Sequence, residues 1–253
     1  MTPRALVATL AVVLAALPPA LASAKETAAK AEKKGAAAGG CPAGMALVPG
    51  GSFTPGEGEK EVTVPALCMD LTEVTVDAWG ACVKSKSCSG DGGSCQEPFG
   101  NSGKADRGNH PINCVEWGKA DGFCKALGKR LPTADEWEWA ARGGSNGWKY
   151  PWGNDLPGAK ACWDGEGSKD GKDKRESSCA VASFPAGDNP QGIHDLAGNV
   201  WEWTSSLSGG QHLGLGGGWG TGRPAGLTVA RRSGNAEGLR PFGLVGFRCV
   251  KAP

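Results

Sequence analysis

Apolar residues recur at helical spacing in the middle of the chain. Between residues 113 and 127 they fall three or four positions apart, at Trp117, Ala120, Phe123, Cys124 and Leu127. This spacing places them on one face of an α-helix. Gly128 follows, where a left-handed C-terminal cap is expected. The pattern predicts a helix over 113–127.

Two shorter helices are predicted from their N-terminal caps. Thr75 precedes a run whose apolar positions keep the same spacing, at Val76, Trp79, Cys82 and Val83. Thr133 and Glu136 form a capping box ahead of a run that ends before the glycines at 143 and 144. Such caps satisfy the free N–H groups of a first helical turn.

The remaining apolar runs are short and separated by glycine-rich turns. Residues 45–53 are predicted to form a strand and turn, and residues 62–68 a second strand. The chain has 42 glycines, and ten tryptophans against one tyrosine. We therefore expect one loop-rich domain whose irregular core is filled by large aromatic side chains.

The first 24 residues have the order of a secretory signal peptide. Arg4 precedes an apolar run over 5–21, and the small residues 22–24 follow, so cleavage is expected after Ala24. A membrane span is the alternative, but Pro18 and Pro19 interrupt the run. Residues 25–40 are mostly Ala, Lys, Glu and Gly and are predicted to be a flexible tether. Residues 41–253 then form the folded domain, in a secreted or periplasmic protein.

Charge and cysteines agree with an exported protein. Loss of Arg4 with the signal peptide would bring the formal net charge from +1 to zero. A neutral chain favours neither nucleic acid nor an anionic membrane as a partner. Ten cysteines, all after residue 40 and none in a Cys-x-x-Cys pair, favour disulfides over zinc. Cys162 with Cys179 would close a charged insert, and Cys82 with Cys88 a small local loop.

The sequence Gly-Asn-Val-Trp-Glu-Trp at 198–203 is the most distinctive motif of the chain. It occurs with further motifs in a fixed order, at 48–53, 73–75, 109–112, 128–138, 142–144, 150–153, 216–219 and 246–249. Together they resemble the formylglycine-generating enzyme family, also called the sulfatase-modifying factor family. The resemblance implies an irregular, loop-rich α+β fold, distantly related to C-type lectins and stabilised by disulfides. It also implies a Cys124–Cys249 disulfide, and leaves Cys41, Cys68, Cys95 and Cys114 unassigned.

The resemblance ends at the catalytic residues. Catalytic family members bind copper(I) through two cysteines shortly after the motif that matches 216–219, because soft thiolates suit this ion. Here Thr221 stands at the first of these positions, and no cysteine lies between Cys179 and Cys249. Gly218 and Leu244 replace a usual serine and asparagine. We therefore expect neither copper binding nor formylglycine generation by the family mechanism.

Two functions follow as hypotheses. The first is a binding module in which Trp201, Trp219 and Arg232 line the former substrate groove and hold a peptide, protein or glycan. The alternative is an oxidoreductase acting on a protein cysteine through an unrecognised site. A thiol such as that of Cys249 could serve there only if it were unpaired.

The resemblance also implies a calcium site. The matching positions are Asp195, Gly198, Val200 and Glu202, which would supply two carboxylates and two main-chain carbonyls, the hard oxygen ligands that calcium prefers. The alternative is a glycine turn in which the aspartate caps local amides. The three histidines, His110, His194 and His212, are expected to be structural rather than an iron triad.

Overall fold

The computed structural model describes residues 40–56, 60–88, 90, 95–96, 98–234, 236–240 and 243–253. The predicted signal peptide (1–24) and the predicted tether up to residue 39 lie outside these ranges. Within them, no helix is both long enough and apolar enough to cross a bilayer.

Short strands form three small sheets among the described residues. The strands are β1 (Met45–Val48), β2 (Gly51–Phe53), β3 (Val62–Val64), β4 (Leu67–Asp70), β5 (Trp201–Ser208), β6 (Gln211–Leu215), β7 (Arg232–Ser233), β8 (Val245–Gly246) and β9 (Val250–Lys251). Their orders are β1-β4-β9, β2-β3 and β7-β6-β5-β8. The pairs are antiparallel except β5 with β8. The strand predicted over 62–68 is therefore two strands, broken at Pro65 and belonging to different sheets.

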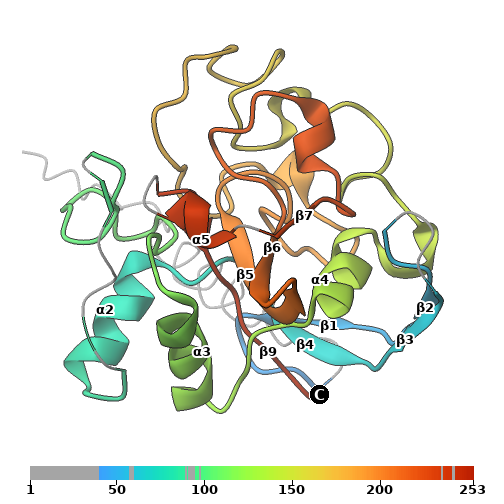
Figure 1. Ribbon diagram of the computed structural model, residues 1–253, viewed down its shortest axis with the longest axis horizontal. Helices are drawn as coiled ribbons and strands as arrows, with labels where there is room; N and C mark the ends of the chain where they lie inside the picture. The colour runs from blue at the N-terminus through green and yellow to red at the C-terminus, as the bar shows by residue number, and fades with distance from the viewer. Residues whose placement is uncertain are drawn as a thin grey trace, which may run out of the picture. The chain divides into compact units, whose positions relative to one another are not determined.

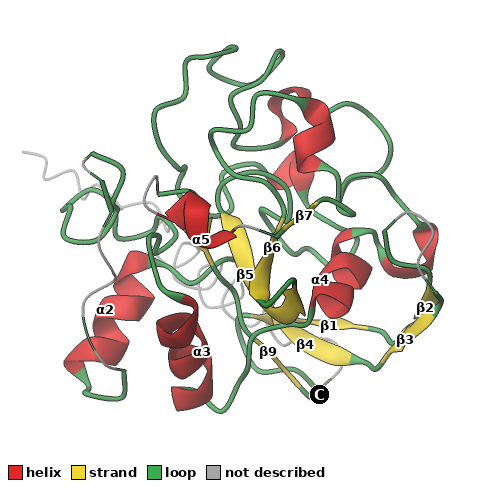
Figure 2. Cartoon of the chain, viewed as in Figure 1, coloured by secondary structure: helices red, strands yellow, loops and turns green. Residues whose placement is uncertain are grey.

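Helices and single turns surround these sheets, and loops make up much of the described chain (Figures 1 and 2). The α-helices are α2 (Val76–Lys84), α3 (Trp117–Ala126), α4 (Ala134–Ala141) and α5 (Ala236–Leu239), and the 3₁₀ turns are η2 (Gly144–Asn146), η3 (Gly158–Lys160), η4 (Pro185–Gly187) and η5 (Pro224–Leu227). Helices α2 and α3 lie side by side (Figure 1), where the rings of Trp79 and Phe123 stack with centroids 5.5 Å apart. The irregular mixed fold predicted from the sequence is the one observed.

The predicted caps are present, but α3 is shorter than expected. Thr75 caps α2, and Thr133 forms the capping box of α4. Helix α3 begins at Trp117 rather than near residue 113, because the Asn113 amide donates to the main-chain carbonyls of Phe99 and Gly243 and so holds that segment as a loop. Gly128 takes the predicted left-handed conformation, with φ 65°.

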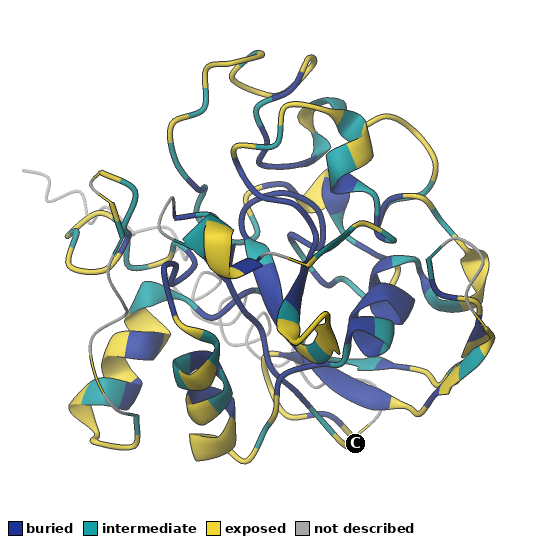
Figure 3. Ribbon diagram, in the orientation of Figure 1, coloured by how far each residue is buried: buried dark blue, intermediate teal, exposed yellow. Residues whose placement is uncertain are grey.

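Helix α4 is buried along most of its length (Figure 3), in contact with β3, β5 and β6. Large aromatic side chains fill the surrounding core, and five of them are fully buried: Trp137, Trp163, Trp203, Tyr150 and Phe247. Helices α2 and α3 bury one face only, and Leu127, predicted to lie on the buried face of α3, is 48% exposed.

All ten cysteines are paired. The disulfides are Cys41–Cys68, Cys82–Cys88, Cys95–Cys114, Cys124–Cys249 and Cys162–Cys179. Three of them join the pairs that were expected from the sequence, and the other two use the four unassigned cysteines. With no free thiol left, Cys249 cannot provide the unpaired sulfur that the oxidoreductase alternative would need.

Candidate functional site

The Gly198-Asn199 turn is held by the two halves of a disulfide. Gly198 has φ 85°, and a β-carbon there would lie 2.4 Å from the carbonyl oxygen of Cys162, so only glycine fits. The same carbonyl accepts from Asn199 N at 2.8 Å, and Cys179 N donates to Asn199 Oδ1 at 2.9 Å. The turn and the charged insert between these cysteines therefore form one unit.

Strand β5 sends the motif side chains to opposite faces of its sheet, because successive residues of a strand alternate. The Trp203 indole donates to the carbonyl of Val115, on the face towards α2 and α3. Glu202 accepts a hydrogen bond from the Trp137 indole of α4 at 2.8 Å. It also forms a bidentate ion pair with Arg248, with both distances 2.7 Å. Trp203 thus belongs to the core, and Glu202 to a buried charged cluster.

That cluster holds more negative than positive charge. Besides Glu202 and Arg248 it contains Glu73 and Asp195, both buried. Burial, together with the neighbouring Asp195 carboxylate, raises the pKa of Glu73 well above its ordinary value. Burial raises the pKa of Asp195 to about 6. Neither oxygen of the Glu73 side chain has a hydrogen-bond partner in the described part of the protein, so the cluster favours a proton or a cation.

The predicted calcium ligands lie at this cluster and fit a cation held partly by main-chain oxygens. Asp195 Oδ2 accepts from Ala182 N at 2.6 Å, and within the described residues Glu202 Oε1 accepts only from Arg248. Among the described residues, no main-chain N–H donates to the carbonyl of Gly198 or Val200. The described chain contains no group of three or more His, Cys, Asp or Glu side chains suited to a metal. A cation here would therefore depend on those two carbonyls.

The three histidines have different surroundings. His194 Nδ1 lies 2.7 Å from Asp188, and His110 Nδ1 lies 3.0 Å from Ser178 Oγ. His212 stacks on Trp117 with ring centroids 3.7 Å apart. Each histidine thus has a separate neighbour.

Thr221 closes a tight turn at the position of the family cysteine. Its hydroxyl accepts from Gly218 N at 3.0 Å, and its own N–H donates to Gly218 O at 2.9 Å. A β-carbon added to Gly226 would lie 2.6 Å from Thr221 Cγ2. Side chains at positions 221 and 226 would therefore touch, but the natural pair offers one hydroxyl and no thiolate.

Leu244 covers this turn with apolar surface. Its Cδ2 atom lies 3.5 Å from the positions that β-carbons would take at Gly218 and Gly220, and Trp201 Cδ1 lies 3.2 Å from the first of these. An apolar contact therefore stands where the family resemblance implies a serine and an asparagine.

The three residues predicted to line one groove have different surroundings. Trp219 is 8% exposed, and its indole donates to Gly243 O with its ring centroid 6.0 Å from that of Phe99. Trp219 is therefore a core residue next to Gly218. Trp201 is half-buried over Gly218.

Arg232 faces the other side of the sheet. It is paired through Leu215 of β6 to Glu202 of β5, so its side chain shares a face with Glu202 and not with Trp201. Its Nη2 atom lies 2.9 Å from both Asp135 and Glu138 of α4. The arginine connects β7 to α4, a contact that the sequence could not indicate because it does not show the strand register. Its role in ligand binding stays a prediction.

A different pocket lies directly beside the Thr221 turn. Its volume is about 330 Å³, and it is lined by Leu156, Pro157, Trp163, Glu166, Lys172, Gly222, Arg223 and Pro224. Leu156 is 67% exposed, the most exposed large apolar side chain in the described residues. The pocket therefore combines apolar side chains with charged ones.

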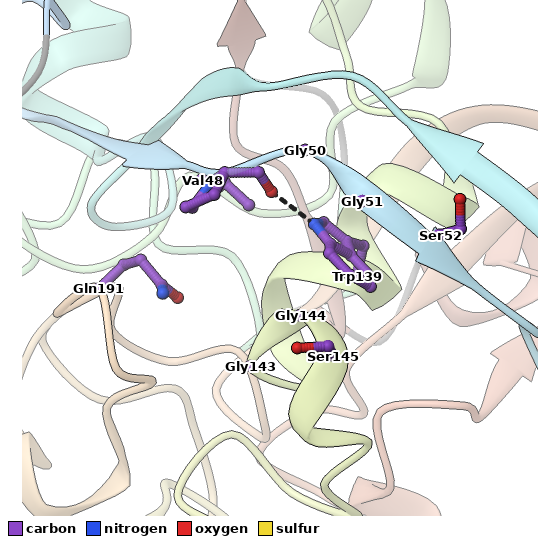
Figure 4. A pocket seen from close by; sticks show the side chains of 10 residues that line it. Val48, Gly50, Gly51, Ser52, Trp139, Gly143, Gly144, Ser145 and Gln191 are labelled. Carbon is purple, nitrogen blue, oxygen red and sulfur yellow. Dashed lines mark hydrogen bonds between the residues drawn. The ribbon is translucent and has the colours of Figure 1, made fainter.

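A second pocket, of about 350 Å³, lies between the β1–β2 turn and the end of α4 (Figure 4). The Trp139 indole donates to Pro49 O at 2.7 Å, and β-carbons at Gly51 or Gly144 would lie 2.5 and 3.2 Å from its ring. Figure 4 shows the Gln191 amide opposite this ring. Glycine is thus needed at both positions to leave room for the Trp139 ring. The residues around this pocket therefore serve packing.

Comparison with known proteins identifies the chain. Residues 30–253 match the family described as sulfatase-modifying factor enzyme 1-like domain.

The chain belongs to this family.

Its relatives include proteins with different activities. Inactive C-alpha-formylglycine-generating enzyme 2 of Bos taurus is 44% identical over 115 residues, or 44% of this chain and 38% of that protein. Formylglycine-generating enzyme of Mus musculus is 40% identical over 121 residues, or 45% of this chain and 32% of that enzyme. The matches thus span less than half of each relative. This chain is about equally similar to both relatives, so overall sequence identity does not indicate whether it is active. That question depends on the residues of the site.

Solved structures agree on the fold. PvdO from Pseudomonas aeruginosa superposes with a TM-score of 0.64 at 23% identity, over 84% of this chain and 95% of that one. CarF superposes with a TM-score of 0.62 at 23% identity, over 84% of this chain and 99% of that one. The α+β, C-type-lectin-like fold of the family is therefore confirmed.

Two members of the buried cluster, Glu73 and Arg248, were not singled out from the sequence. Each lies in a family motif, at 73–75 and 246–249. The sequence offered one sign that these two residues are buried, namely a charged residue inside a short apolar motif. Their partnership needs the fold, because they are far apart in the chain.

Proposed function

We propose that this protein is an exported, non-catalytic member of the family that binds a peptide or glycan beside its former active site. The observation that carries the proposal is the Thr221 turn, where a hydroxyl bonded to Gly218 stands in place of a copper-binding thiolate. The pairing of all ten cysteines supports the same conclusion. Copper(I) needs soft sulfur ligands, and none remains at this turn.

A peptide is the favoured ligand. The pocket beside Thr221 has an apolar floor that includes Leu156, with Glu166, Lys172 and Arg223 among its lining residues. Leu156 is exposed and borders the pocket, so its apolar surface is available to a ligand. An extended peptide could place an apolar side chain on the floor and an acidic one against Lys172 or Arg223.

Calcium belongs to the proposal as a structural ion. Asp195 and Glu202 would hold it with the carbonyls of Gly198 and Val200, and it would neutralise part of the excess charge of the buried cluster. Because Cys162 and Cys179 are bonded to the same turn, an ion there would also steady the insert that borders the peptide pocket.

The loss of activity can be tested directly. The folded protein is incubated with a Cys-x-Pro-x-Arg peptide, copper(I), oxygen and a mild reductant, and the peptide is weighed by mass spectrometry. We expect no aldehyde. The matched control is the double variant Thr221→Cys/Gly226→Cys, which would bring two thiols into contact and should bind copper(I). Aldehyde formed by the natural protein would refute the proposal and support an oxidoreductase with an unrecognised site.

Binding is tested with the same peptide, and in parallel with soluble oligosaccharides. Leu156→Asp and Arg223→Ala alter exposed residues of the pocket, and each should weaken peptide binding at least severalfold. Lys84→Ala, on the exposed end of α2, is the control and should leave affinity unchanged. Peptide binding that survives both pocket variants would place the ligand elsewhere, and binding of oligosaccharide alone would make the protein a glycan binder.

A further inference from the structure

One disulfide accepts a hydrogen bond from an arginine side chain. Arg175 Nη1 lies 2.7 Å from Cys179 Sγ, and the Arg175 side chain is only 8% exposed. No other cysteine sulfur in the described ranges accepts a hydrogen bond. The contact therefore distinguishes Cys162–Cys179 from the other four disulfides.

The arginine is held in place by its own insert. Its Nε donates to Trp163 O at 3.2 Å, and its main-chain N donates to Asp164 Oδ1 at 2.8 Å. Asp170 contacts the second terminal nitrogen of the guanidinium. With these bonds made, the Nη1 atom remains directed at the sulfur, where it would stabilise negative charge.

The two sulfurs differ in access. Cys162 is fully buried, whereas Cys179 is partly exposed. An incoming thiolate can therefore reach Cys179 and not Cys162. A cation beside a cysteine sulfur favours the thiolate over the thiol, and a stabilised thiolate is the better leaving group in disulfide exchange.

We propose that Cys162–Cys179 is a site of thiol–disulfide exchange with dithiols, and that Arg175 is its positioning and charge-stabilising residue. One thiolate of the dithiol attacks Cys179 Sγ, the S–S bond breaks, and Cys162 leaves as a thiolate that takes up a proton. The second thiolate of the dithiol then attacks its own sulfur in the mixed disulfide and displaces Cys179 as a thiolate beside Arg175. The dithiol loses two electrons and becomes a cyclic disulfide, and the protein gains them as two reduced cysteines.

Exchange would act on the neighbouring turn and pocket. Both halves of the disulfide bond to Asn199, and the insert between them contacts the Thr221 turn through Asp164 N, 3.1 Å from Thr221 O. Glu166 and Lys172 of the insert also line the proposed peptide pocket. Reduction would release one anchor of this insert and weaken peptide binding, a consequence that rests on the proposed function.

The exchange itself is tested without any ligand. The folded protein is treated with dithiothreitol at low concentration, quenched with iodoacetamide at intervals, and digested for mass spectrometry. We expect Cys162 and Cys179 to be labelled before every other pair, including Cys82 and Cys88, which close a loop of comparable kind and include a partly exposed sulfur. Simultaneous labelling of all pairs, or earlier labelling of another pair, would overturn the proposal.

The role of Arg175 is tested by Arg175→Gln and Arg175→Lys. The glutamine variant should slow reduction of this pair roughly 3- to 10-fold, and lysine should restore part of the rate. The reason is that the positive charge attracts the anionic dithiol towards Cys179 in the first step and stabilises the Cys179 thiolate that leaves in the second. A faster or unchanged rate in the glutamine variant would contradict the assignment.

A second measurement separates charge from folding. In Cys162→Ala, the remaining Cys179 thiol is alkylated over a range of pH, with and without Arg175→Gln. The pH midpoint should rise when the arginine is lost, whereas a merely structural role would leave it unmoved. Both results hold or fail whether or not the protein binds peptide, so the proposed function is tested independently.

Discussion

Arg248 and Glu202 form a bidentate ion pair in the interior of the protein, with Nε 2.7 Å from Oε2 and Nη2 2.7 Å from Oε1. The two side chains are 0% and 1% exposed. The other donors of the guanidinium reach the main-chain oxygens of Asp70 and His194. One arginine thus connects β4, β5 and the segment before the Gly-Asn turn.

Replacing Arg248 with methionine should destabilise the protein strongly. The variant would leave Glu202 buried beside Glu73 and Asp195 without the one positive charge that faces all three. Removing one partner of a buried pair costs about 3–5 kcal/mol, measured as the free energy of unfolding in urea. Arg231→Met, at an exposed position, should change it by less than about 0.5 kcal/mol. A similar small change for both variants would show that the cluster contributes little.

The buried acids should make stability depend on pH in an unusual direction. Burial raises the pKa of Asp195 from 3.8 to about 6 and that of Glu73 well above 4.5. The folded state then binds more protons than the unfolded one, so this contribution is complete below about pH 4 and is lost as the pH rises through 6. Glu73→Gln should therefore be increasingly stabilising from pH 5 to pH 7.5, as followed by thermal unfolding.

Bound calcium should reduce the loss of stability that occurs as the pH rises. In protein stripped with a chelator, added calcium should raise the melting temperature at pH 7.5 and have little effect at pH 4.5, where the acids are protonated. Asp195→Asn should reduce the calcium effect, with Asp155→Asn at an exposed position as the control. An equal effect of calcium on both variants would place the ion elsewhere.

The Cys124–Cys249 disulfide should be a major source of stability. It spans 125 residues, against 6 for Cys82–Cys88. Constraint of the unfolded chain grows with loop length, from about 2 kcal/mol for the short loop to about 3–5 kcal/mol for the long one. Alanine at both cysteines of each pair should follow that order in urea unfolding. Equal losses would mean that the other disulfides already restrict the long loop.

The leader prediction has a direct test. Expression in a secreting host should give a mature protein that begins at Lys25, read from its intact mass, because the small residues before that position suit signal peptidase. Ala24→Pro should block this cleavage, and Ala38→Pro should not. A full-length mass for the natural protein would favour the membrane-span alternative.

The elements that the sequence predicted well are those set by local chemistry. Thr75 and Thr133 cap α2 and α4 because each needs only a neighbouring N–H group. Gly198 belongs to a motif that can be recognised from the sequence alone. The family fold followed from such motifs in order, without knowledge of any long-range contact.

Long-range geometry explains what was missed. Arg232 was assigned to the groove although it pairs with α4, since its facing depends on the register of β7 against β6. The start of α3 moved because Asn113 is bonded to Gly243, 130 residues away. Neither contact leaves a trace in local periodicity. The sequence also did not indicate that Glu73 and Arg248 join Asp195 and Glu202 in one charged cluster, because these residues come from separate parts of the chain.

The alternation along β5 has a consequence for engineering this scaffold. Trp203 and Glu202 are consecutive residues whose side chains point to opposite faces of the sheet. The number of residues in the motif therefore matters as much as their identity. Adding or deleting one residue between Gly198 and Trp203 would exchange an indole for a carboxylate in both layers at once. Library design should therefore keep the length of the motif fixed.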